Sequence, residues 1–384
     1  MSKWMVSYED LIDEQINFLD YKVFESSNQW INGFAGSGKS VLLMHALATI
    51  KEREPDARIH VVYFTHSLRQ MYRVGMGELR INARGITFGT YIQFERSHQQ
   101  HYDYIFCDEV QDLTESVLIQ MKNSCRKLFI SGDPNQSIYD KDPQTGNPVI
   151  DVNRLGYVTS SEETKLTTVH RLTASVIKLI SSLMPSMGIL KAKPNAKKID
   201  VTPRLAKFDN ALLEVEYIME EAFEAISNDK SVVVIFPNHA QILKFASIYC
   251  DSKNELPWKK VTNKWGMLNY NLFNEFYHRL KIHVIGNNYG DLVSANRAGK
   301  VVLMTYYSVK GLDFDSVFMP FLNAESKIEE EALFMVALSR SKNTLYLTHT
   351  DEMHPYLEKI SDDCEDISSV VGKADNDDFD DFIF

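Results

Sequence analysis

The chain has 384 residues, of which 44% are hydrophobic and 24% charged, and its net charge is −11 at pH 7. These values are typical of globular domains and exclude collagen-like fibres, coiled-coil rods and disorder over the whole chain. The longest dense apolar runs, such as residues 232–236, are far shorter than the roughly 20 residues that span a bilayer, and the first ten residues contain no signal-peptide core. Four cysteines without C-x-x-C spacing favour a reducing cytoplasm over a disulfide framework or a zinc finger. We therefore expect a cytoplasmic protein of two or three domains with no membrane partner.

The negative charge is concentrated at the C-terminal end. Nine acidic residues and one lysine follow position 361, so this segment has a charge of −8 and residues 1–361 have only −3. A nearly neutral body is compatible with a local basic groove, so the net charge does not exclude a nucleic-acid partner. We expect residues 361–384 to form a disordered acidic tail. Its tip, Phe382-Ile383-Phe384, leaves three alternatives open: docking into a protein partner, mimicry of a polynucleotide in the chain's own groove, or solubilisation alone.

Short apolar runs predict the strands of the chain. They are continuously apolar rather than alternating, which is typical of parallel strands covered by helices on both faces. Amphipathic stretches such as residues 210–227 lie between them, and this alternation predicts doubly wound α/β domains. The runs form two groups, which predicts domains at residues 1–165 and 166–360. The predicted strands are residues 59–65, 104–107, 127–131, 232–236, 282–285, 301–305, 317–321 and 344–348.

A glycine-rich motif, GFAGSGKS at positions 33–40, matches G-x4-G-K-[ST] and lies between a short apolar run and a helix-like stretch. Glycines allow backbone N–H groups to surround phosphate oxygens, and the N-terminus of the next helix adds its positive dipole end. The motif predicts that Lys39 contacts the terminal phosphates of ATP and that Ser40 binds Mg²⁺. The nucleotide-binding residues expected in this loop are Gly33, Ala35, Gly36, Ser37, Gly38, Lys39 and Ser40.

Two adjacent acids, Asp108 and Glu109, follow the predicted strand at 104–107. An acid at the end of a buried strand is placed to bind Mg²⁺, while its neighbour can deprotonate the attacking water. A strand that ends in Asp-Glu is common by itself, so the prediction depends on the phosphate loop upstream. Together the two motifs predict an ATPase site in which Asp108 is a metal ligand and Glu109 is the general base.

These motifs and several others, in the same order along the chain, resemble the UvrD/Rep-type superfamily 1 DNA helicases. The resemblance covers about residues 10–350, and DEVQD at 108–112 with SGDPNQSIY at 131–139 resembles motifs II and III of that family. It implies two RecA-like P-loop domains with parallel sheets, an ATP site in the cleft between the domains, and 3′-to-5′ movement on single-stranded nucleic acid, with DNA as the expected strand. The other matching segments are Gln15, Phe64-Thr65, residues 87–90, His170-Arg171, residues 305–315 and residues 336–342.

The roles of further residues follow from this resemblance. Gln15 is expected to read adenine, and Gln136 to sense the γ-phosphate or to order the attacking water. Arg171 and Arg340 are the expected arginine fingers from the second domain, because guanidinium groups match phosphate oxygens. The further expected nucleotide contacts are Gly311 and Asp313, and the expected strand contacts are Phe64, Thr65, Thr87, Tyr91 and Thr305.

The chain departs from the family in two respects. Only 17 residues separate Thr90 from Asp108 and 133 separate Arg171 from Thr305, so neither large accessory domain of UvrD-like helicases has a place. The aromatic-Arg-Gly segment that usually follows motif III, whose ring stacks on a base, is replaced by residues 140–142, Asp-Lys-Asp. Loss of one stacking platform costs about 1–3 kcal/mol of strand binding. We therefore expect a minimal two-domain motor, and its ability to separate a duplex alone stays open.

A second class of function fits the same departures. In this alternative the chain is a regulatory NTPase subunit that switches a partner, such as a nuclease, without processive unwinding. Its ATPase activity would respond to that partner rather than to single strands. A nucleotide kinase shares only the phosphate loop and is disfavoured by DEVQD and by the arginines of the second domain.

Overall fold

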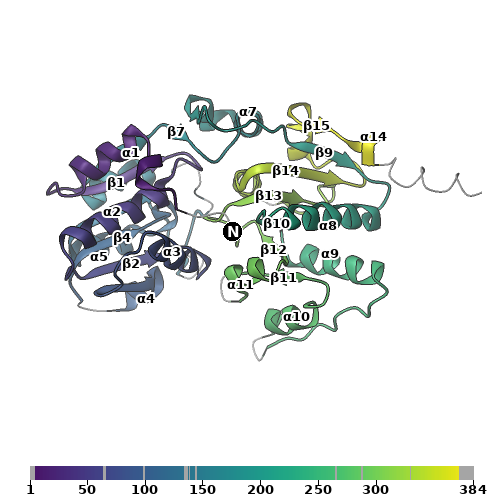
Figure 1. Cartoon of the computed structure of the whole chain (residues 1–384), viewed down its shortest axis with the longest axis horizontal. Helices are drawn as coiled ribbons and strands as arrows, with labels where there is room; N and C mark the ends of the chain where they lie inside the picture. The colour runs from purple at the N-terminus through teal and green to yellow at the C-terminus, as the bar shows by residue number, and fades with distance from the viewer. Residues whose placement is uncertain are drawn as a thin grey trace, which may run out of the picture. The chain divides into compact units, whose positions relative to one another are not determined.

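The computed structural model describes residues 5–63, 66–97, 100–133, 137, 139–142, 145–263, 266–286, 289–328 and 330–371. The chain forms two compact units, each built on its own parallel sheet (Figure 1). The first unit comprises Lys3–Arg171 and Lys191–Asn195, and the second comprises Leu172–Leu190 and Ala196–Phe384. None of the helices in these described ranges has the length and the apolar character needed to cross a membrane.

The sheet of the first unit has the strand order β3-β2-β4-β5-β1-β6, and neighbouring strands are parallel. The strands are β1 (Asn28–Gly33), β2 (Ile59–Tyr63), β3 (Ile86–Thr90), β4 (Tyr102–Cys107), β5 (Cys125–Gly132) and β6 (Ser161–Leu166). The helices are α1 (Asp13–Asn17), α2 (Lys39–Arg53), α3 (His66–Glu78), α4 (Tyr91–Arg96), α5 (Glu115–Asn123) and α6 (Leu155–Thr159). A small separate sheet pairs β7 (Thr168–Val169) with β8 (Lys193–Pro194), which returns residues 191–195 to this unit.

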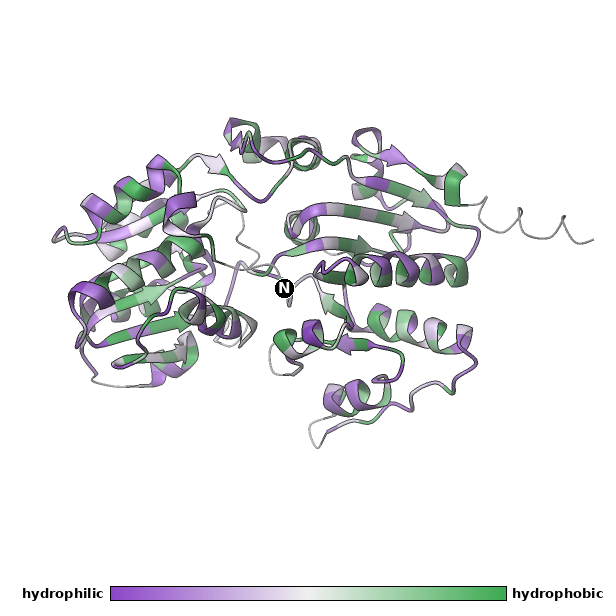
Figure 2. Ribbon diagram, viewed as in Figure 1, coloured by the Kyte–Doolittle hydropathy of each residue, from purple (hydrophilic) through white to green (hydrophobic). Residues whose placement is uncertain are grey.

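Apolar side chains cover both faces of this sheet. Successive residues of β2 point to opposite faces, so Val61 packs in one buried cluster and Val62 in another. Helix α2 contributes Leu42 to the first cluster, and α5 contributes Val117 to the second. Figure 2 shows the apolar character of the strands beneath helices whose outer positions are hydrophilic. Two helical layers around a continuously apolar sheet are the physical reason for the sequence pattern.

The strand order brings three loops to one edge of the first sheet. Strand β5 lies between β4 and β1, with Phe106 opposite Phe129 and Ile31 opposite Ser131. Because the strands are parallel, the segments that follow β1, β4 and β5 all leave the sheet at its carboxyl edge. Ligands of open α/β sheets bind at this edge.

The sheet of the second unit has the strand order β11-β12-β10-β13-β14-β9-β15, again with parallel neighbours. The strands are β9 (Arg204–Lys207), β10 (Val232–Phe236), β11 (Ile282–Val284), β12 (Val301–Thr305), β13 (Phe314–Met319), β14 (Ser341–His349) and β15 (Glu365–Asp366). The helices are α7 (Ala174–Leu183), α8 (Ala211–Ser227), α9 (His239–Ser252), α10 (Tyr270–Phe276), α11 (Leu292–Arg297), α12 (Glu331–Leu338), α13 (Pro355–Glu358) and α14 (Ser368–Val371).

The α/β fold class with two parallel sheets, which the apolar runs predict, is confirmed. All eight predicted strands are present, as β2, β4, β5, β10, β11, β12, β13 and β14. The list of predicted strands lacks β1, β9 and β15, and it also lacks β3 and β6, the two edge strands of the first sheet. Both are partly exposed, so they lack the continuous apolar pattern of central strands.

The expected boundaries differ from the compact units in two places. Residues 166–171 and 191–195 belong to the first unit rather than to the second. The tail expected to be disordered from residue 361 is ordered up to Val371, because β15 pairs with β9 and the backbone N–H of Glu365 donates to the carbonyl of Pro203 at 2.8 Å. The acidic-aromatic tip lies outside the described residues.

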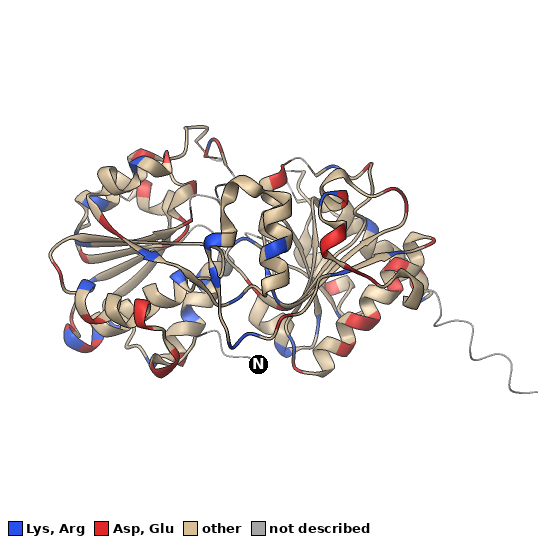
Figure 3. Ribbon diagram, turned by 90° about the horizontal axis from the view of Figure 1, so that it is seen from above, with Lys and Arg blue, Asp and Glu red and all other residues tan. Residues whose placement is uncertain are grey.

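In Figure 3, acidic and basic residues are interspersed over both units.

A buried carboxyl group, Glu214 of α8, joins three segments of the second unit. Its Oε1 accepts a hydrogen bond from the backbone N–H of Phe321 at 2.8 Å and one from the hydroxyl of Thr348 at 2.6 Å. Its Oε2 is buried and has no hydrogen-bond partner within the described ranges. Burial raises the pKa of Glu214 to about 7, against the opposite effect of the two hydrogen bonds. The fold therefore favours the protonated acid below neutral pH.

This raised pKa predicts a pH-dependent stability. The contribution of Glu214 is fully present below its unfolded pKa of 4.5 and is lost as the pH rises through about 7. Over that interval the free energy of unfolding should fall by about 3 kcal/mol because of this group. Urea denaturation of wild type and Glu214→Gln across the interval measures the effect, since the variant should lose this part of the slope. Glu220→Gln, an exposed change on the same helix, is the matched control, and equal slopes in wild type and Glu214→Gln would contradict the prediction.

Candidate functional site

The phosphate loop connects the end of β1 to the first residue of α2. Gly36 has a backbone φ of +74° and Gly38 one of +86°, a region that side chains disfavour. A Cβ on Gly36 would also lie 2.5 Å from Cβ of Arg171, and one on Gly38 would lie 2.7 Å from Nε2 of Gln15. Both glycines are therefore required for conformation and for space. The buried side chain of Gln15, the predicted adenine reader, lies against this loop.

Two polar side chains inside the loop are suited to phosphate oxygens. The Lys39 ammonium donates to the backbone carbonyl of Gly33 at 2.7 Å and to that of Phe34 at 3.2 Å, so it is folded over the loop. The Ser37 hydroxyl is buried and has no hydrogen-bond partner within the described ranges. A buried donor without a partner is costly unless a ligand satisfies it. The loop therefore fits a phosphate group, which accepts hydrogen bonds from backbone N–H, hydroxyl and ammonium donors alike.

Asp108, at the end of β4, is the centre of a hydrogen-bond network. Its carboxylate accepts hydrogen bonds from the hydroxyls of Ser40 and Ser131, from the Tyr72 hydroxyl at 3.1 Å and from the backbone N–H of Glu109 at 2.9 Å. Burial and the neighbouring Glu109 raise the pKa of Asp108. No sequence motif indicated Tyr72, which reaches Asp108 from α3, and Ser131 was visible only as part of motif III.

Glu109 is held in an unusual backbone conformation. Its φ of +57° lies in the left-handed region, which is costly for a residue with a side chain. The Nε2 of Gln111 donates to Oε2 of Glu109 at 2.5 Å, and Oε1 of Gln111 accepts from the backbone N–H of Asp133 at 3.3 Å. A Cβ on Gly132 would lie 2.6 Å from that Oε1, so the glycine makes room for the amide. Gln111 therefore orients the predicted base, a role that sequence reasoning missed.

The site can hold ATP with a divalent cation. The Ser40 hydroxyl and the Asp108 carboxylate lie in direct contact and are oxygen donors of the type that Mg²⁺ prefers. Within the described ranges, no group of three His, Cys, Asp or Glu side chains is placed to hold a metal ion. A cation here would take its remaining ligands from phosphate and water, which is usual for Mg²⁺ in nucleotide sites.

The structure corrects the expected origin of Arg171. Its backbone N–H donates to the carbonyl of Gly36 at 3.2 Å, and that of His170 donates to the same oxygen at 2.8 Å. Both residues belong to the first unit. Arg171 therefore lies against the phosphate loop by main-chain bonding, and it does not need to be supplied by the second unit as the sequence had suggested.

Arg340 is anchored inside the second unit. Its guanidinium donates to the carbonyls of Val336 at 2.8 Å and Leu312 at 3.2 Å, and to the hydroxyl of Ser339 at 2.8 Å. The side chain is only 1% exposed. Its proposed role as an arginine finger stays a prediction. The two other nucleotide contacts expected in this unit are Gly311, with φ of +80°, and Asp313, which pairs with Lys342 at 3.4 Å.

The structure describes two of the expected strand contacts of the first unit, Thr87 and Tyr91. Tyr91 is 3% exposed and packs in the apolar core beside α5, so its ring is not a stacking surface. Thr87 is exposed on β3, where its hydroxyl is paired with Nδ1 of His60 at 2.7 Å. The other two expected strand contacts of this unit, Phe64 and Thr65, lie outside the described residues, as does Gln136, the expected γ-phosphate sensor.

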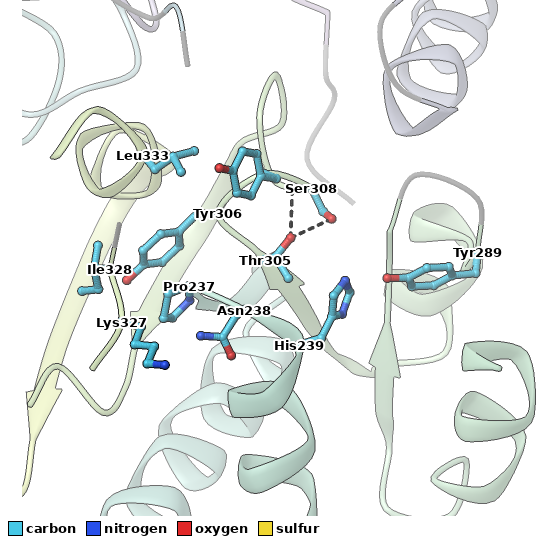
Figure 4. A pocket seen from close by; sticks show the side chains of 11 residues that line it. Pro237, Asn238, His239, Tyr289, Thr305, Tyr306, Ser308, Lys327, Ile328 and Leu333 are labelled. Carbon is cyan, nitrogen blue, oxygen red and sulfur yellow. Dashed lines mark hydrogen bonds between the residues drawn. The ribbon is translucent and has the colours of Figure 1, made fainter. Parts of the chain in front are cut away.

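The remaining strand contact, Thr305, borders a pocket of the second unit (Figure 4). The pocket has a volume of about 440 Å³ and lies at the carboxyl edge of β10 and β12. Thr305 Oγ1 and Ser308 Oγ are 2.9 Å apart, and the backbone N–H of Ser308 donates to Thr305 Oγ1 at 3.2 Å. Asn238 and His239, which begin α9, line the same pocket.

Two family models match the chain. One describes the viral superfamily 1 RNA helicase core domain and matches residues 29–263, and the other describes the UvrD-like helicase C-terminal domain and matches residues 266–352. The chain belongs to the superfamily 1 helicases. The predicted resemblance to UvrD-type members and the layout of two RecA-like domains are thereby confirmed. No curated protein sequence matches it.

Several solved helicase structures are similar to this chain at low sequence identity. Arterivirus nonstructural protein 10 (helicase) is 14% identical with a TM-score of 0.45, and the match covers 90% of this chain and 63% of that chain. The same helicase in complex with DNA is 15% identical with a TM-score of 0.43, and the match covers 90% of this chain and 65% of that chain. The PRRSV helicase is 13% identical with a TM-score of 0.43, and the match covers 87% of this chain and 54% of that chain. The helicase chain described here thus spans less than two thirds of the length of each of these proteins.

Replacing Gly36 by alanine should prevent nucleotide binding, because the new Cβ would lie 2.5 Å from Arg171 and the backbone would be held at an unfavourable φ. We expect the affinity for a fluorescent ATP analogue to fall by at least about tenfold, which corresponds to about 1.4 kcal/mol. Gly77→Ala in α3, where an added Cβ meets nothing within 4 Å, is the control and should leave that affinity unchanged. Wild-type affinity in Gly36→Ala would refute the assignment of the phosphate cradle.

Proposed function

We propose that this chain is a cytoplasmic, ATP- and Mg²⁺-dependent translocase or helicase that acts on single-stranded DNA, with 3′-to-5′ movement by family resemblance. The observation that carries the proposal is the arrangement at the end of β4, where Ser40 donates to Asp108 and Gln111 holds Glu109. A loop that only bound phosphate would need no second acid in a strained backbone conformation. The helicase family models support this class of activity over a regulatory NTPase subunit.

The proposed chemistry begins with the phosphates. Backbone N–H groups of the loop, the Lys39 ammonium and the Ser37 hydroxyl bind phosphate oxygens, and Ser40 and Asp108 hold the cation. A bound Mg²⁺ would neutralise and polarise the phosphate oxygens. Lys39 is already folded over the loop carbonyls, so binding exchanges these hydrogen bonds for stronger ones to phosphate.

Glu109 is the proposed general base. It accepts a proton from the attacking water while Gln111 keeps the carboxylate in one orientation. Arg171, which is tied to the loop at Gly36, stabilises the charge that develops on the transferred phosphate. Three residues of the second unit are proposed to sense the bound nucleotide. They are Arg340, Gly311 and Asp313.

The pocket beside Thr305 is the proposed strand contact. It lies at a carboxyl edge of a parallel sheet, the position at which open α/β sheets bind ligands, and it offers hydroxyl groups and the N-terminus of α9 to phosphates. The UvrD-like C-terminal family model covers the segment that contains Thr305, which supports a role in helicase action. The other family model is named for RNA helicases, so single-stranded RNA is the necessary comparison in every strand assay.

Glu109→Gln tests the proposed chemistry. The amide is isosteric but cannot take a proton, so ATP turnover with single-stranded DNA should fall by at least about 100-fold while ATP binding persists. Turnover is measured by phosphate release with and without a DNA strand, and with an RNA strand of the same sequence. Glu115→Gln, a change at a half-buried acid of α5 that pairs with Arg154 at the surface, is the matched control and should behave as wild type. Wild-type turnover in Glu109→Gln, or wild-type turnover that no strand stimulates, would refute the proposal.

Arg171→Ala separates phosphate catalysis from folding better than a change at Arg340, whose buried guanidinium donates hydrogen bonds to Val336, Leu312 and Ser339 inside the second unit. We expect kcat for ATP to fall by at least about 100-fold, because an arginine at the developing charge contributes mainly to the transition state. Steady-state kinetics supply kcat and KM. Arg154→Ala removes a surface ion pair with Glu115 and is the control. A change confined to KM would contradict a role in stabilising the transferred phosphate.

A further inference from the structure

The pocket beside Thr305 has an aromatic side that the family resemblance did not predict. His239 and Tyr289 both line the pocket, and Figure 4 places Tyr289 and Lys327 at opposite ends of it. The two aromatic residues come from different segments: His239 follows β10, and Tyr289 follows β11. Both lie at the carboxyl edge of the sheet, after the two strands that flank β12 and Thr305.

A buried tyrosine, Tyr270 of α10, supports both rings. Its ring stacks on that of Tyr289 with centroids 4.5 Å apart and planes 20° apart. Its hydroxyl is 2.8 Å from Nδ1 of His239, and the centroids of those two rings are 5.1 Å apart. Tyr270 itself is 5% exposed and packs in the core of the second unit, so it provides a rigid backing. His239 is exposed and Tyr289 half-buried, so both remain accessible from the pocket.

The backbone is adapted to hold the ring of Tyr289 in this place. The backbone N–H of Gly286 donates to the carbonyl of Tyr289 at 3.0 Å, which closes a tight turn. A Cβ on Gly286 would lie only 2.3 Å from Cζ of Tyr289, so the ring occupies the space that any other residue would fill. Gly290, with φ of +78°, then returns the chain past Val284. The turn therefore fixes the direction of one aromatic side chain.

A second, independent feature of the pocket indicates a ligand. Tyr306 is 1% exposed and lines the pocket, yet its hydroxyl has no hydrogen-bond partner within the described ranges. Figure 4 shows this ring on the side of Lys327 and Ile328, away from Tyr289. The pocket thus combines an aromatic surface with an unsatisfied hydroxyl and an exposed ammonium group, as a ligand with a flat ring and an anionic group requires.

We propose that Tyr289, with His239, is a nucleobase-stacking platform of the second unit, and that it replaces the aromatic ring that motif III of this chain lacks. This inference rests on the proposed action on single strands and names the residue that grips the base. Stacking accepts any base, because every base has a flat π-face. The strand contact would therefore show little sequence preference.

The test measures binding of the full chain to two fluorescent oligonucleotides of equal length, one of thymidines and one of abasic sites. Because one base stacks on the ring, wild type should bind the thymidine strand more tightly than the abasic strand. The affinity of Tyr289→Ala for the thymidine strand should be roughly 5- to 150-fold lower than that of wild type. Its affinity for the abasic strand should stay unchanged, because phosphate contacts remain. Tyr289→Phe keeps the ring and should bind as wild type. Tyr157→Ala removes an 83% exposed tyrosine and is the control.

A second variant guards against a simple folding defect. Gly286→Ala leaves Tyr289 in the chain but displaces its ring, and it should reproduce the selective loss of thymidine binding. Basal ATP turnover without a strand should be that of wild type in both variants. Equal losses for thymidine and abasic strands, or no loss, would overturn the platform while leaving the motor proposal intact. A wild type that binds neither strand and shows no stimulated turnover would instead overturn the proposed function itself.

Discussion

The hydrogen bonds that converge on Asp108 connect the segments on which the nucleotide site depends. Ser40 comes from the first turn of α2, Ser131 from β5 and Tyr72 from α3, and all three hydroxyls donate to the one carboxylate. A buried carboxylate is costly unless hydrogen bonds or a cation satisfy it. The three donors lower that cost and fix the acid relative to the phosphate loop. A second acid, Glu109, can then be placed beside it only through a strained backbone and the amide of Gln111.

Both units present functional groups at the same edge of a parallel sheet, and the chemistry of these groups differs between the two units. In the first unit, the loops after β1, β4 and β5 present hydroxyls, an ammonium and carboxylates, which suit phosphate and a cation. In the second unit, the segments after β10, β11 and β12 present aromatic rings with a few polar groups, which suit a base and its backbone. The difference lies in short loop segments, since in both units the sheets supply only position and direction.

Local patterns in the sequence determined the elements whose signal is contiguous. The phosphate loop could be predicted because the cradle is made by eight consecutive residues, 33–40, whose backbone does most of the binding. The acids at 108 and 109 could be predicted because they end an apolar run, and the parallel sheets because strands buried on both faces have no polar alternation. The edge strands β3 and β6 escaped prediction for the converse reason, as did β15, in which two acidic residues gain order by pairing with β9.

Contacts between distant segments were decided only by the tertiary structure. Residue type alone could not show that Tyr72 would reach Asp108, that Tyr91 would be buried in the core rather than offered to a strand, or that Arg171 would bond to the loop at Gly36. The cluster of the aromatic residues His239, Tyr270 and Tyr289 likewise forms because strand order, and not distance along the sequence, decides which segments are neighbours. Hydrophobic pattern and backbone preference act over a few residues, so they can be recognised in the sequence. The partner of a side chain depends instead on how whole sheets and helices pack.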